Sequence, residues 1–500
     1  MEFGLASLAF FKKVKGGDAM LKSISTIWDY RQFTSSQKSK LSRSDLLRLD
    51  SKIFKSALHK LSKLDVGLAS EEICSYYSNT GRPARDPGVI LRSFILMNHL
   101  GYTSLHKWCS ILNSDRLLQY LVGSFDSLCV SNHYDFIERL TGEVHHLDKL
   151  FTKDYYKKPK DKPKKGEKLV NYSSQDTRYL LEKYKNGAKE DRDRKLYKIQ
   201  SLFNTLIVNP SLDKGLIDKQ EFVLSGDGSS LHIHASTFPK KVKEGNDNEE
   251  IYRVSAPDAD IGWDSDLGAY YLGYTLYNIS YHNKKYGIDL PVYLTLKKAS
   301  VHDALTSIEA FAQLLDMNSK LHPDYICLDS ASDSLAIYQY FRLNNIIPVI
   351  DHNKRHNNKA REKGGKEYIN NDGIPVCRNS VTMCPNGYDY TRKRYKYRCP
   401  LVMGKISECP FKEECSSSRY GRVIYVNDGD EAKYNGPLSY RDDKWIQIYK
   451  NRSSTERINN RILNDYKLHS MKCKDLAKNA FMSIIAGINI HLDAWIKLEA

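Results

Sequence analysis

The sequence predicts an α/β protein with an all-α region at its N-terminal end. Apolar residues recur at helical spacing in the N-terminal third and again near the C-terminal end. Between them, short runs rich in valine, isoleucine, threonine and tyrosine alternate with helical stretches. Consecutive strands followed by alternating helices and strands indicate a mixed sheet covered by helices. A length of 500 residues leaves room for two or three domains.

The chain carries an excess of positive charge. Its 76 lysines and arginines against 60 aspartates and glutamates give a formal net charge of +16. Such an excess favours nucleic acid as a partner, and a solubilising surface is the alternative. No apolar run approaches the roughly 18–20 residues that span a bilayer, and 10 cysteines are too sparse for a secreted disulfide scaffold. We therefore expect a cytoplasmic, nucleoid-associated protein without a membrane partner.

Changes in composition divide the chain into several segments. We expect an N-terminal tail at 1–40, a helical domain at 41–150, a basic linker with a helical segment at 151–215, the first part of the α/β core at 216–352, a basic insertion rich in cysteine and tyrosine at 353–440, and the C-terminal helices of the core at 441–500. Lysine- and proline-rich text within the linker cannot pack a core, which is typical of an exposed arm.

The N-terminal helical domain begins with helices expected over 45–50 and 55–61. Pro87 is placed to open a helix that runs through 89–100 and stops at a glycine. Another helix begins near Ser104. Two helices joined by a short glycine-containing turn are typical of a DNA-binding helix-turn-helix, and an ordinary helical bundle fits the same pattern equally well.

The α/β region is expected to contain five strands and two helices. The strands are expected at 222–225, 270–280, 290–297, 325–328 and 346–350, and the helices at about 303–315, with Asp303 as the N-terminal cap, and at 335–343. This order predicts a sheet with both parallel and antiparallel pairs.

Two aspartates follow apolar strands in this region. Asp227 lies within Gly226-Asp-Gly228, which we interpret as a turn whose glycines let a phosphate approach the backbone; a plain Asp-Gly turn is the alternative. Asp329 follows a second strand, and we assign it to a metal because Asp333 is better placed to cap the next helix. Strand ends hold carboxylates rigidly, and carboxylate oxygens are the ligands that Mg²⁺ prefers.

A third carboxylate, Glu456, lies seven residues after a tyrosine and four after an arginine. On a continuous helix these spacings place Tyr449, Arg452 and Glu456 on one face. The alternative is a capping box formed by Ser453 and Glu456, in which the glutamate only ties down a helix start.

In combination these motifs resemble a bacterial insertion-sequence DDE transposase with a ribonuclease-H-like catalytic domain. Asp227-Gly228-Ser229 resembles the family's first aspartate motif, and Tyr449, Arg452 and Glu456 keep the spacing of its tyrosine–arginine–glutamate signature. Further similar segments are Gly81-Arg-Pro83, Asp86-Pro87, Leu91-Arg92, Pro257-Asp-Ala259, Gly273-Tyr-Thr-Leu-Tyr277 and Ser300-Val-His302-Asp303.

The resemblance implies that Asp227, Asp329 and Glu456 bind two Mg²⁺ or Mn²⁺ ions. It implies that Arg452 contacts a phosphate near the cleaved end, and that Tyr449 contacts a phosphate or a displaced base. The implied activity is cut-and-paste DNA transposition, in which strands are cleaved at the element ends and the freed 3′-hydroxyl attacks target DNA. The implied partners are the terminal inverted repeats, the target DNA and a second copy of the chain in a homodimer.

One position departs from the family signature. Leu463 stands where a lysine is expected, seven residues after the glutamate, and Arg461 or Lys467 could replace it as a DNA contact. This departure keeps two other functions open: a catalytically silent DNA-binding protein of transposon origin, and a metal-dependent nuclease that cuts without joining.

The insertion is rich in cysteine. Cys384, Cys399, Cys409 and Cys415 could hold a tetrahedral structural Zn²⁺, and reduced, unliganded thiols are the alternative. Cys377 is a fifth candidate or a bystander. Elsewhere we expect packed or solvent-facing histidines and buried cysteines rather than metal ligands, at His232, His234, Cys74, Cys109, Cys129, Cys327 and Cys473.

Overall fold

The structure of the protein is a computed structural model. It describes residues 21, 24–78, 80–141, 196–236, 240–244, 249–253, 255–352, 368–369, 374–392, 394–427, 438 and 440–499. Much of the expected N-terminal tail and most of the expected basic linker lie outside these residues.

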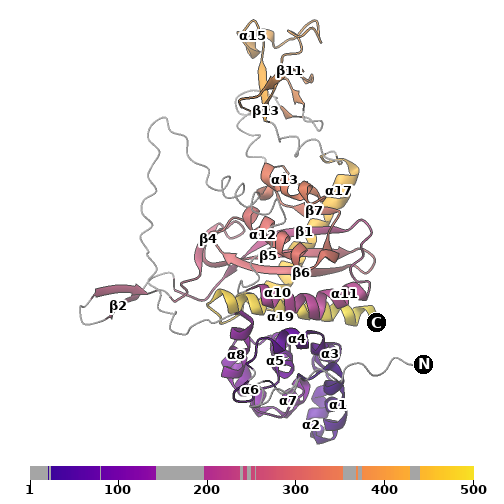
Figure 1. Ribbon diagram of the computed structural model, residues 1–500, viewed down its shortest axis with the longest axis vertical. Helices are drawn as coiled ribbons and strands as arrows, with labels where there is room; N and C mark the ends of the chain where they lie inside the picture. Colours follow the sequence, from indigo (N-terminus) through magenta and orange to yellow (C-terminus); the bar gives the residue numbers. More distant parts are fainter. Residues whose placement is uncertain are drawn as a thin grey trace.

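The N-terminal helical region forms a bundle at one end of the molecule (Figure 1). Its helices are α1 (Ile27–Gln37), η1 (Lys38–Lys40), α2 (Arg43–Leu49), α3 (Lys52–Leu61), η2 (Val66–Ala69), α4 (Ser70–Cys74), α5 (Pro87–His99), α6 (Leu105–Ser114), α7 (Arg116–Val122) and α8 (Val130–Thr141). The predicted start of α5 is confirmed: Pro87 is its first residue, and the Asp86 side chain caps it by accepting a hydrogen bond from the amide of Gly88. Residues 87–98 are all buried, so α5 is the central helix of a bundle.

The middle of the molecule is a mixed sheet, as predicted. Its strands are β1 (Val223–His232), β4 (Asp260–Asp264), β5 (Ala269–Asn283), β6 (Ile288–Lys298), β7 (Tyr325–Leu328) and β8 (Ile347–Ile350). They lie in the order β4-β5-β1-β7-β8, and β6 also pairs with β5. The pairs β1–β5, β4–β5 and β5–β6 are antiparallel, whereas β1–β7 and β7–β8 are parallel. A hairpin of β2 (Lys240–Glu244) and β3 (Glu249–Arg253) precedes β4.

Strand β1 differs from the prediction. It was expected to stop at Ser225 and to deliver Asp227 into a turn, but it continues to His232 along an antiparallel ladder with β5. Its parallel pairing with β7, in contrast, ends at Ser225, which lies opposite Cys327. The ladder to β5 overrides the low strand propensity of the glycine- and serine-rich stretch. Asp227 therefore lies inside a strand, where one neighbouring strand has ended and the other continues.

Helices cover both faces of the sheet (Figure 1). Along the chain, α12 (Asp303–Met317) and η5 (Ser319–Leu321) connect β6 to β7, and η6 (Ser330–Ser332) and α13 (Leu335–Leu343) connect β7 to β8. The others are α10 (Tyr197–Phe203), η4 (Asn204–Val208), α11 (Asn209–Asp213), α17 (Asp443–Tyr449), η7 (Lys450–Arg452), α18 (Ser453–Asn460), η8 (Arg461–Asp465), η9 (Leu468–Ser470) and α19 (Leu476–Glu499).

Helix α19 joins the two regions. It packs on β6 of the sheet and on α5 of the N-terminal bundle. Among the described residues it is the one helix that is long and apolar enough to cross a membrane by length and composition, although no such segment was expected. Because 78% of its apolar stretch is buried inside the protein, it has the environment of a core helix.

The cysteine-rich insertion projects beyond α13 and α17 (Figure 1). It contains β9 (Tyr368–Ile369), β10 (Pro375–Val376), β11 (Cys384–Asp389), β12 (Arg394–Arg398), α15 (Lys412–Cys415) and β13 (Val423–Asn427), with β11, β12 and β13 in one antiparallel sheet. The core residues on either side of the insertion contact each other. The rings of His352 and Tyr440 stack with centroids 3.7 Å apart, and Arg441 pairs with Asp351 at 3.2 Å. The chain thus leaves the core and re-enters it at one place.

A buried ion pair fastens the N-terminal bundle to α19. Lys60 of α3, whose side chain is 2% exposed, lies 2.8 Å from Asp493 of α19. Burial lowers the pKa of Lys60. We expect Lys60→Ala to lower the free energy of unfolding by roughly 2 kcal/mol, because it removes a buried side chain and leaves Asn489, to which Lys60 donates at 3.3 Å, without this donor, while Asp493 keeps Arg461 as a partner.

The matched control is Lys63→Ala, whose partner Glu499 has a side chain that is 46% exposed. An exposed pair contributes about 0.5 kcal/mol. Urea denaturation of both variants measures the difference, and equal shifts of the two midpoints would contradict this account.

Candidate active site

The strand register brings two of the predicted carboxylates together. Ser225 of β1 lies opposite Cys327 of β7 in the parallel pair, and Asp227 and Asp329 each follow two residues later. Residues two apart on a strand share a face, so both aspartates emerge at the same end and on the same side of the sheet. The Asp329 backbone remains extended, and its side chain does not cap the short helix that follows.

The third carboxylate lies on an unbroken helical run. Helix α17, the 3₁₀ turn η7 and helix α18 follow one another without a gap, and Arg452, immediately before α18, already has helical backbone angles. The capping box is not formed: Ser453 donates its hydroxyl to the carbonyl of Lys450 instead. Tyr449, Arg452 and Glu456 therefore share one face, as the functional interpretation requires.

Arg452 connects the helix to the sheet. One guanidinium nitrogen, Nη1, lies 3.6 Å from Asp227 Oδ2, and the other, Nη2, lies 2.5 Å from Glu456 Oε1. The Arg452 side chain is 25% exposed, and those of Asp227 and Glu456 are 18% and 54% exposed. The structure thus places three of the predicted residues in one cluster, with Asp329 beside Asp227.

Buried hydrogen bonds hold the helical run against the sheet. Cys327 lies two residues before Asp329, and its thiol donates to the carbonyl of Ile448 at 3.2 Å. The hydroxyls of Ser280 on β5 and Ser454 on α18 are 2.7 Å apart. These contacts come from the strands that flank or hold the aspartates, so they fix the position of Glu456 relative to both.

Asp227 has an unusual proton affinity. Burial, and then the nearby charge of Asp329, raise its pKa to about 8, while Arg452 acts in the opposite direction. The Arg452 guanidinium therefore offsets only part of the effect of burial and of the neighbouring carboxylate on Asp227. A site of this kind favours the binding of further cations.

A fourth carboxylate, Asp303, lies close to the cluster. We expected it to cap α12, but the cap is His302, whose ring accepts a hydrogen bond from the amide of Ala304 at 3.1 Å. The Asp303 side chain instead packs against Gly228 of β1: a Cβ atom added to that glycine would lie 2.5–2.7 Å from the carboxylate. Burial and the charge of Asp329 raise the pKa of Asp303 to about 6. In the sequence, Asp303 stands at a helix start, so it was interpreted as a cap and not as a neighbour of the other carboxylates.

The glycines beside Asp227 have a different purpose from the one expected. A Cβ atom at Gly226 would lie 2.5 Å from the Tyr277 hydroxyl and 2.9 Å from a methyl group of Leu328. Together with the contact of Asp303 on Gly228, this shows that protein side chains, not an approaching phosphate, fill the space beside the strand. The two glycines let Tyr277, Leu328 and Asp303 pack tightly against β1.

The remaining signature residue, Tyr449, is half-buried. Its ring stacks on Trp445 with centroids 4.6 Å apart, and the Arg452 guanidinium lies 5.8 Å from its centroid. Burial raises the pKa of its hydroxyl to about 12, so it stays protonated and can donate a hydrogen bond.

Of the positions considered for the missing lysine, Leu463 and Arg461 take part in the fold, whereas Lys467 is exposed. Leu463 is buried, with 5% exposure. Arg461 pairs with Asp493 at 2.9 Å in the network that contains Lys60. Lys467 begins the next turn in a left-handed conformation, with φ of 56°. The structure therefore ties Arg461 to α19 rather than to the carboxylate cluster.

Several further expectations have clear outcomes. Asp333 does not cap α13, because the N-cap is Ser334 and it makes no side-chain capping bond. His232 packs as expected, stacked on Tyr271 and 2.8 Å from Asp264. Cys109 and Cys327 are buried as expected, but Cys473 is only partly buried, and Cys74 and Cys129 are exposed because their side chains face outward from the bundle.

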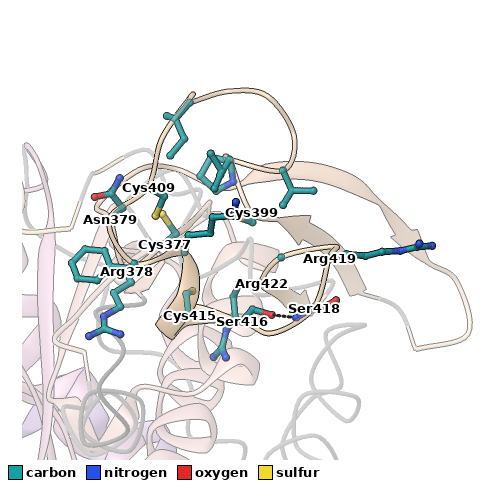
Figure 2. A pocket seen from close by; sticks show the side chains of 17 residues that line it. Cys377, Arg378, Asn379, Cys399, Cys409, Cys415, Ser416, Ser418, Arg419 and Arg422 are labelled. Atoms are coloured by element: carbon teal, nitrogen blue, oxygen red, sulfur yellow. Dashed lines mark hydrogen bonds between the residues drawn. The ribbon is translucent and has the colours of Figure 1, made fainter.

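Four cysteines of the insertion line a single cavity of about 130 Å³. They are Cys377, Cys399, Cys409 and Cys415, and they surround it on separate turns (Figure 2). Cys384, which the sequence grouped with three of them, is not among the lining residues. In the part of the chain that the structure describes, no three Asp, Glu, His or Cys side chains are already gathered closely enough to coordinate a metal.

The comparison with known families identifies a class for the N-terminal region. Residues 48–137, from the end of α2 into α8, match the family model described as Transposase domain (DUF772). This match supports a transposase family for the chain and, with it, DNA as the partner. No curated protein and no solved structure matches the chain.

The raised pKa of Asp227 sets a pH dependence. With a pKa of about 8 in the folded chain and about 3.9 in the unfolded chain, the folded state retains a proton that the unfolded state releases. The free energy of unfolding therefore falls as the pH rises from about 4 to about 8, and this dependence ends above the folded pKa. In buffer without divalent cations, we expect the thermal midpoint of Asp227→Asn to fall less over this range and to exceed that of the wild type near pH 8.

Differential scanning fluorimetry across this pH range measures the effect. Asp126→Asn is the control, because the side chain of Asp126 is 70% exposed in a surface ion pair, and it should follow the wild type. Parallel curves for the wild type and Asp227→Asn would show that Asp227 ionises normally.

Proposed function

We propose that the chain is a DDE-type DNA transposase. The observation that carries the proposal is the convergence of Asp227 on a sheet strand and Glu456 on a helix upon one arginine, Arg452. Asp329 is placed beside Asp227 by the parallel register of the neighbouring strand. A transposase domain matched at 48–137 supports a transposase, without specifying the DDE type.

The topology of the sheet supports a ribonuclease-H-like core. Strands β6, β5 and β1 form an antiparallel meander, and β7 and β8 continue it in parallel on the other side of β1. The carboxylates lie on the two central strands and on a helix that packs over β5 and β6. This is the order of elements expected for that fold.

We infer that the site binds two divalent cations, although its carboxylates are not gathered closely enough to coordinate a metal in the part of the chain that the structure describes. Asp227, Asp329 and Glu456 would hold them, with oxygen ligands of the kind that Mg²⁺ or Mn²⁺ prefers. Burial and the charge of Asp329 raise the pKa of Asp227, and bound cations would favour its charged form. When bound, such a pair of ions would activate the attacking oxygen and stabilise the leaving oxygen of a phosphodiester.

The protein itself supplies orientation and positive charge. Arg452 is held by Asp227 and Glu456, so its guanidinium is positioned to contact a phosphate beside the cleaved bond when the carboxylates bind cations. Arginine suits this role because its planar fork matches phosphate oxygens. Tyr449, protonated and adjacent, would donate to a neighbouring phosphate or stack on a displaced base.

The proposal extends to the substrate and the assembly. The net charge of +16 and the transposase domain favour double-stranded DNA, with the helical region binding the terminal inverted repeats. Cleavage at the element ends would be followed by attack of the 3′-hydroxyl on target DNA, within a homodimer.

One observation favours a second candidate function. The expected lysine position is the buried Leu463, and Arg461 is bound to Asp493, so the contact expected at Leu463 is lost and the exposed Lys467 is the remaining candidate for it. A chain that cleaves but does not join, or that binds DNA without cleaving it, would fit this loss.

The carboxylates can be tested with DNA that carries the ends of the element encoding this chain. In Mg²⁺ or Mn²⁺, we expect Asp227→Ala, Asp329→Ala and Glu456→Ala each to reduce cleavage by roughly 1000-fold or more, with DNA binding retained. Asp333→Ala is the matched control and should cleave normally, because it lies near Asp329 without belonging to the cluster.

The outcomes separate the candidates. Cleavage with strand-transfer products supports the transposase, cleavage without them supports the nuclease, and binding without cleavage supports the silent DNA-binding protein. Normal cleavage by Glu456→Ala would remove Glu456 from the site.

Asp303 should act as a positioning residue. Because it lies beneath Gly228 and beside Asp329, Asp303→Asn should reduce cleavage roughly 10–100-fold and raise the Mg²⁺ concentration that gives half-maximal activity. Glu309→Gln, on the same helix and paired with Lys297 at 2.6 Å, is the control. An unchanged Mg²⁺ dependence in Asp303→Asn would exclude the role.

A further inference from the structure

The cysteine-rich insertion has too small a hydrophobic core to be stable by itself. Among its described residues, 374–392 and 394–427, the buried apolar side chains other than proline are Val376, Cys377, Met383 and Val426. Exposed aromatic rings are frequent instead, with Tyr390 85% exposed. Small domains with so little core usually rely on disulfides or a structural metal. All ten cysteines of the chain are described, and none forms a disulfide.

The four cysteines around the cavity lie on ordered turns. The carbonyls of Cys377, Cys399 and Cys409 accept backbone hydrogen bonds of 2.9, 3.1 and 3.2 Å from residues three or four further along. The amide of Cys415 donates at 2.9 Å to the carbonyl four residues before it. Turns of this kind project each thiol from a fixed backbone, which is how structural zinc sites present their ligands.

The chain closes tightly over one of these turns. Gly421 has a φ of +68°, and a Cβ atom added there would lie 2.6 Å from the Cβ of Cys399. The amide of Cys399 also donates at 2.9 Å to the carbonyl of Arg422. The segment that follows α15 is therefore held against Cys399. Cys377, Cys409 and Cys415, which are distant from Cys399 in the sequence, line the same cavity (Figure 2).

We propose that Cys377, Cys399, Cys409 and Cys415 bind one structural Zn²⁺ in this cavity. Four thiols lose their protons to the solvent as four sulfur–zinc bonds form, and the oxidation states of sulfur and zinc do not change. The four sulfurs are not gathered closely enough for a metal among the described residues, so zinc binding would require the short cysteine side chains to rotate towards one another. The thiolate charge is balanced by basic residues that line the cavity, among them Arg378 and Arg422.

This ligand set replaces Cys384 by Cys377 for a geometric reason. Cys384 lies directly opposite Arg398 in the β11–β12 pair, and opposed residues of a sheet share a face. Cys399 follows Arg398 in the chain, so alternation directs it to the other face. The Arg398 side chain lies over the Tyr420 ring at 5.3 Å, and neither residue lines the cavity.

The role of such a metal is to replace the missing core of the insertion. With zinc bound, the turns around the cavity are cross-linked, and the sheet of β11, β12 and β13 is fixed to α15. The inference stands apart from the transposase proposal, because it concerns the fold of the insertion and is tested without DNA.

The experiment measures zinc in the full-length chain purified from zinc-supplemented medium. We expect one Zn²⁺ per chain in the wild type, its loss in Cys377→Ser and Cys409→Ser, and its retention in Cys384→Ser, the matched control. Chelation should also accelerate proteolysis within residues 374–427, because the metal stabilises this segment.

Two results would overturn the proposal. One is a wild type that contains no zinc and shows no thiolate-to-metal absorption when titrated with Co²⁺. The other is retention of zinc by Cys377→Ser with loss in Cys384→Ser. The Co²⁺ titration uses the folded wild type, so it decides the question even if a cysteine variant fails to fold. The zinc content and the Co²⁺ absorption are measured without DNA, so a failure of DNA cleavage would not change the conclusion about zinc.

Discussion

The contact of Arg452 with Asp227 and Glu456 is the interaction on which the candidate site depends. Carboxylates that are partly buried near one another repel, and only fixed backbone or added positive charge keeps them together. Here the parallel register of β1 and β7 fixes the two aspartates, and the docked helical run fixes the glutamate. The arginine supplies part of the balancing charge, but burial, together with the charge of Asp329, still raises the pKa of Asp227.

The sheet that holds the two aspartates is connected to the N-terminal bundle through α19. The side-chain amide of Asn489 on α19 donates to the backbone carbonyl of Ile95 at 3.2 Å and to the side-chain oxygen of Asn98 at 3.0 Å. Both acceptors belong to the central helix α5. The opposite side of α19 packs on β6. One helix therefore contributes to the cores of both regions, so the bundle has a fixed orientation relative to the carboxylates.

Much of this arrangement could be predicted from the sequence, and the failures have physical causes. Strand β7 and helix α13 have the predicted bounds, because their apolar patterns are short and clearly delimited. The end of β1 was misplaced because its pairing with β5 stabilises residues of low strand propensity. Asp303 was misread because local spacing shows a helix start, whereas its contact with Gly228 is distant in sequence. The grouping of Cys384 with Cys399 failed to match the cavity for a similar reason, since sheet register decides which face a side chain occupies.

The contact between His352 and Tyr440 has a consequence for how this chain can change over time. The two core segments that border the insertion meet at a stacked ring pair and at the ion pair of Asp351 with Arg441. A segment whose ends meet in this way closes its own loop, and its length imposes little on the remainder of the fold. Residues between these two points are therefore free to be exchanged, shortened or extended as a cassette, while the α/β core on either side keeps its geometry.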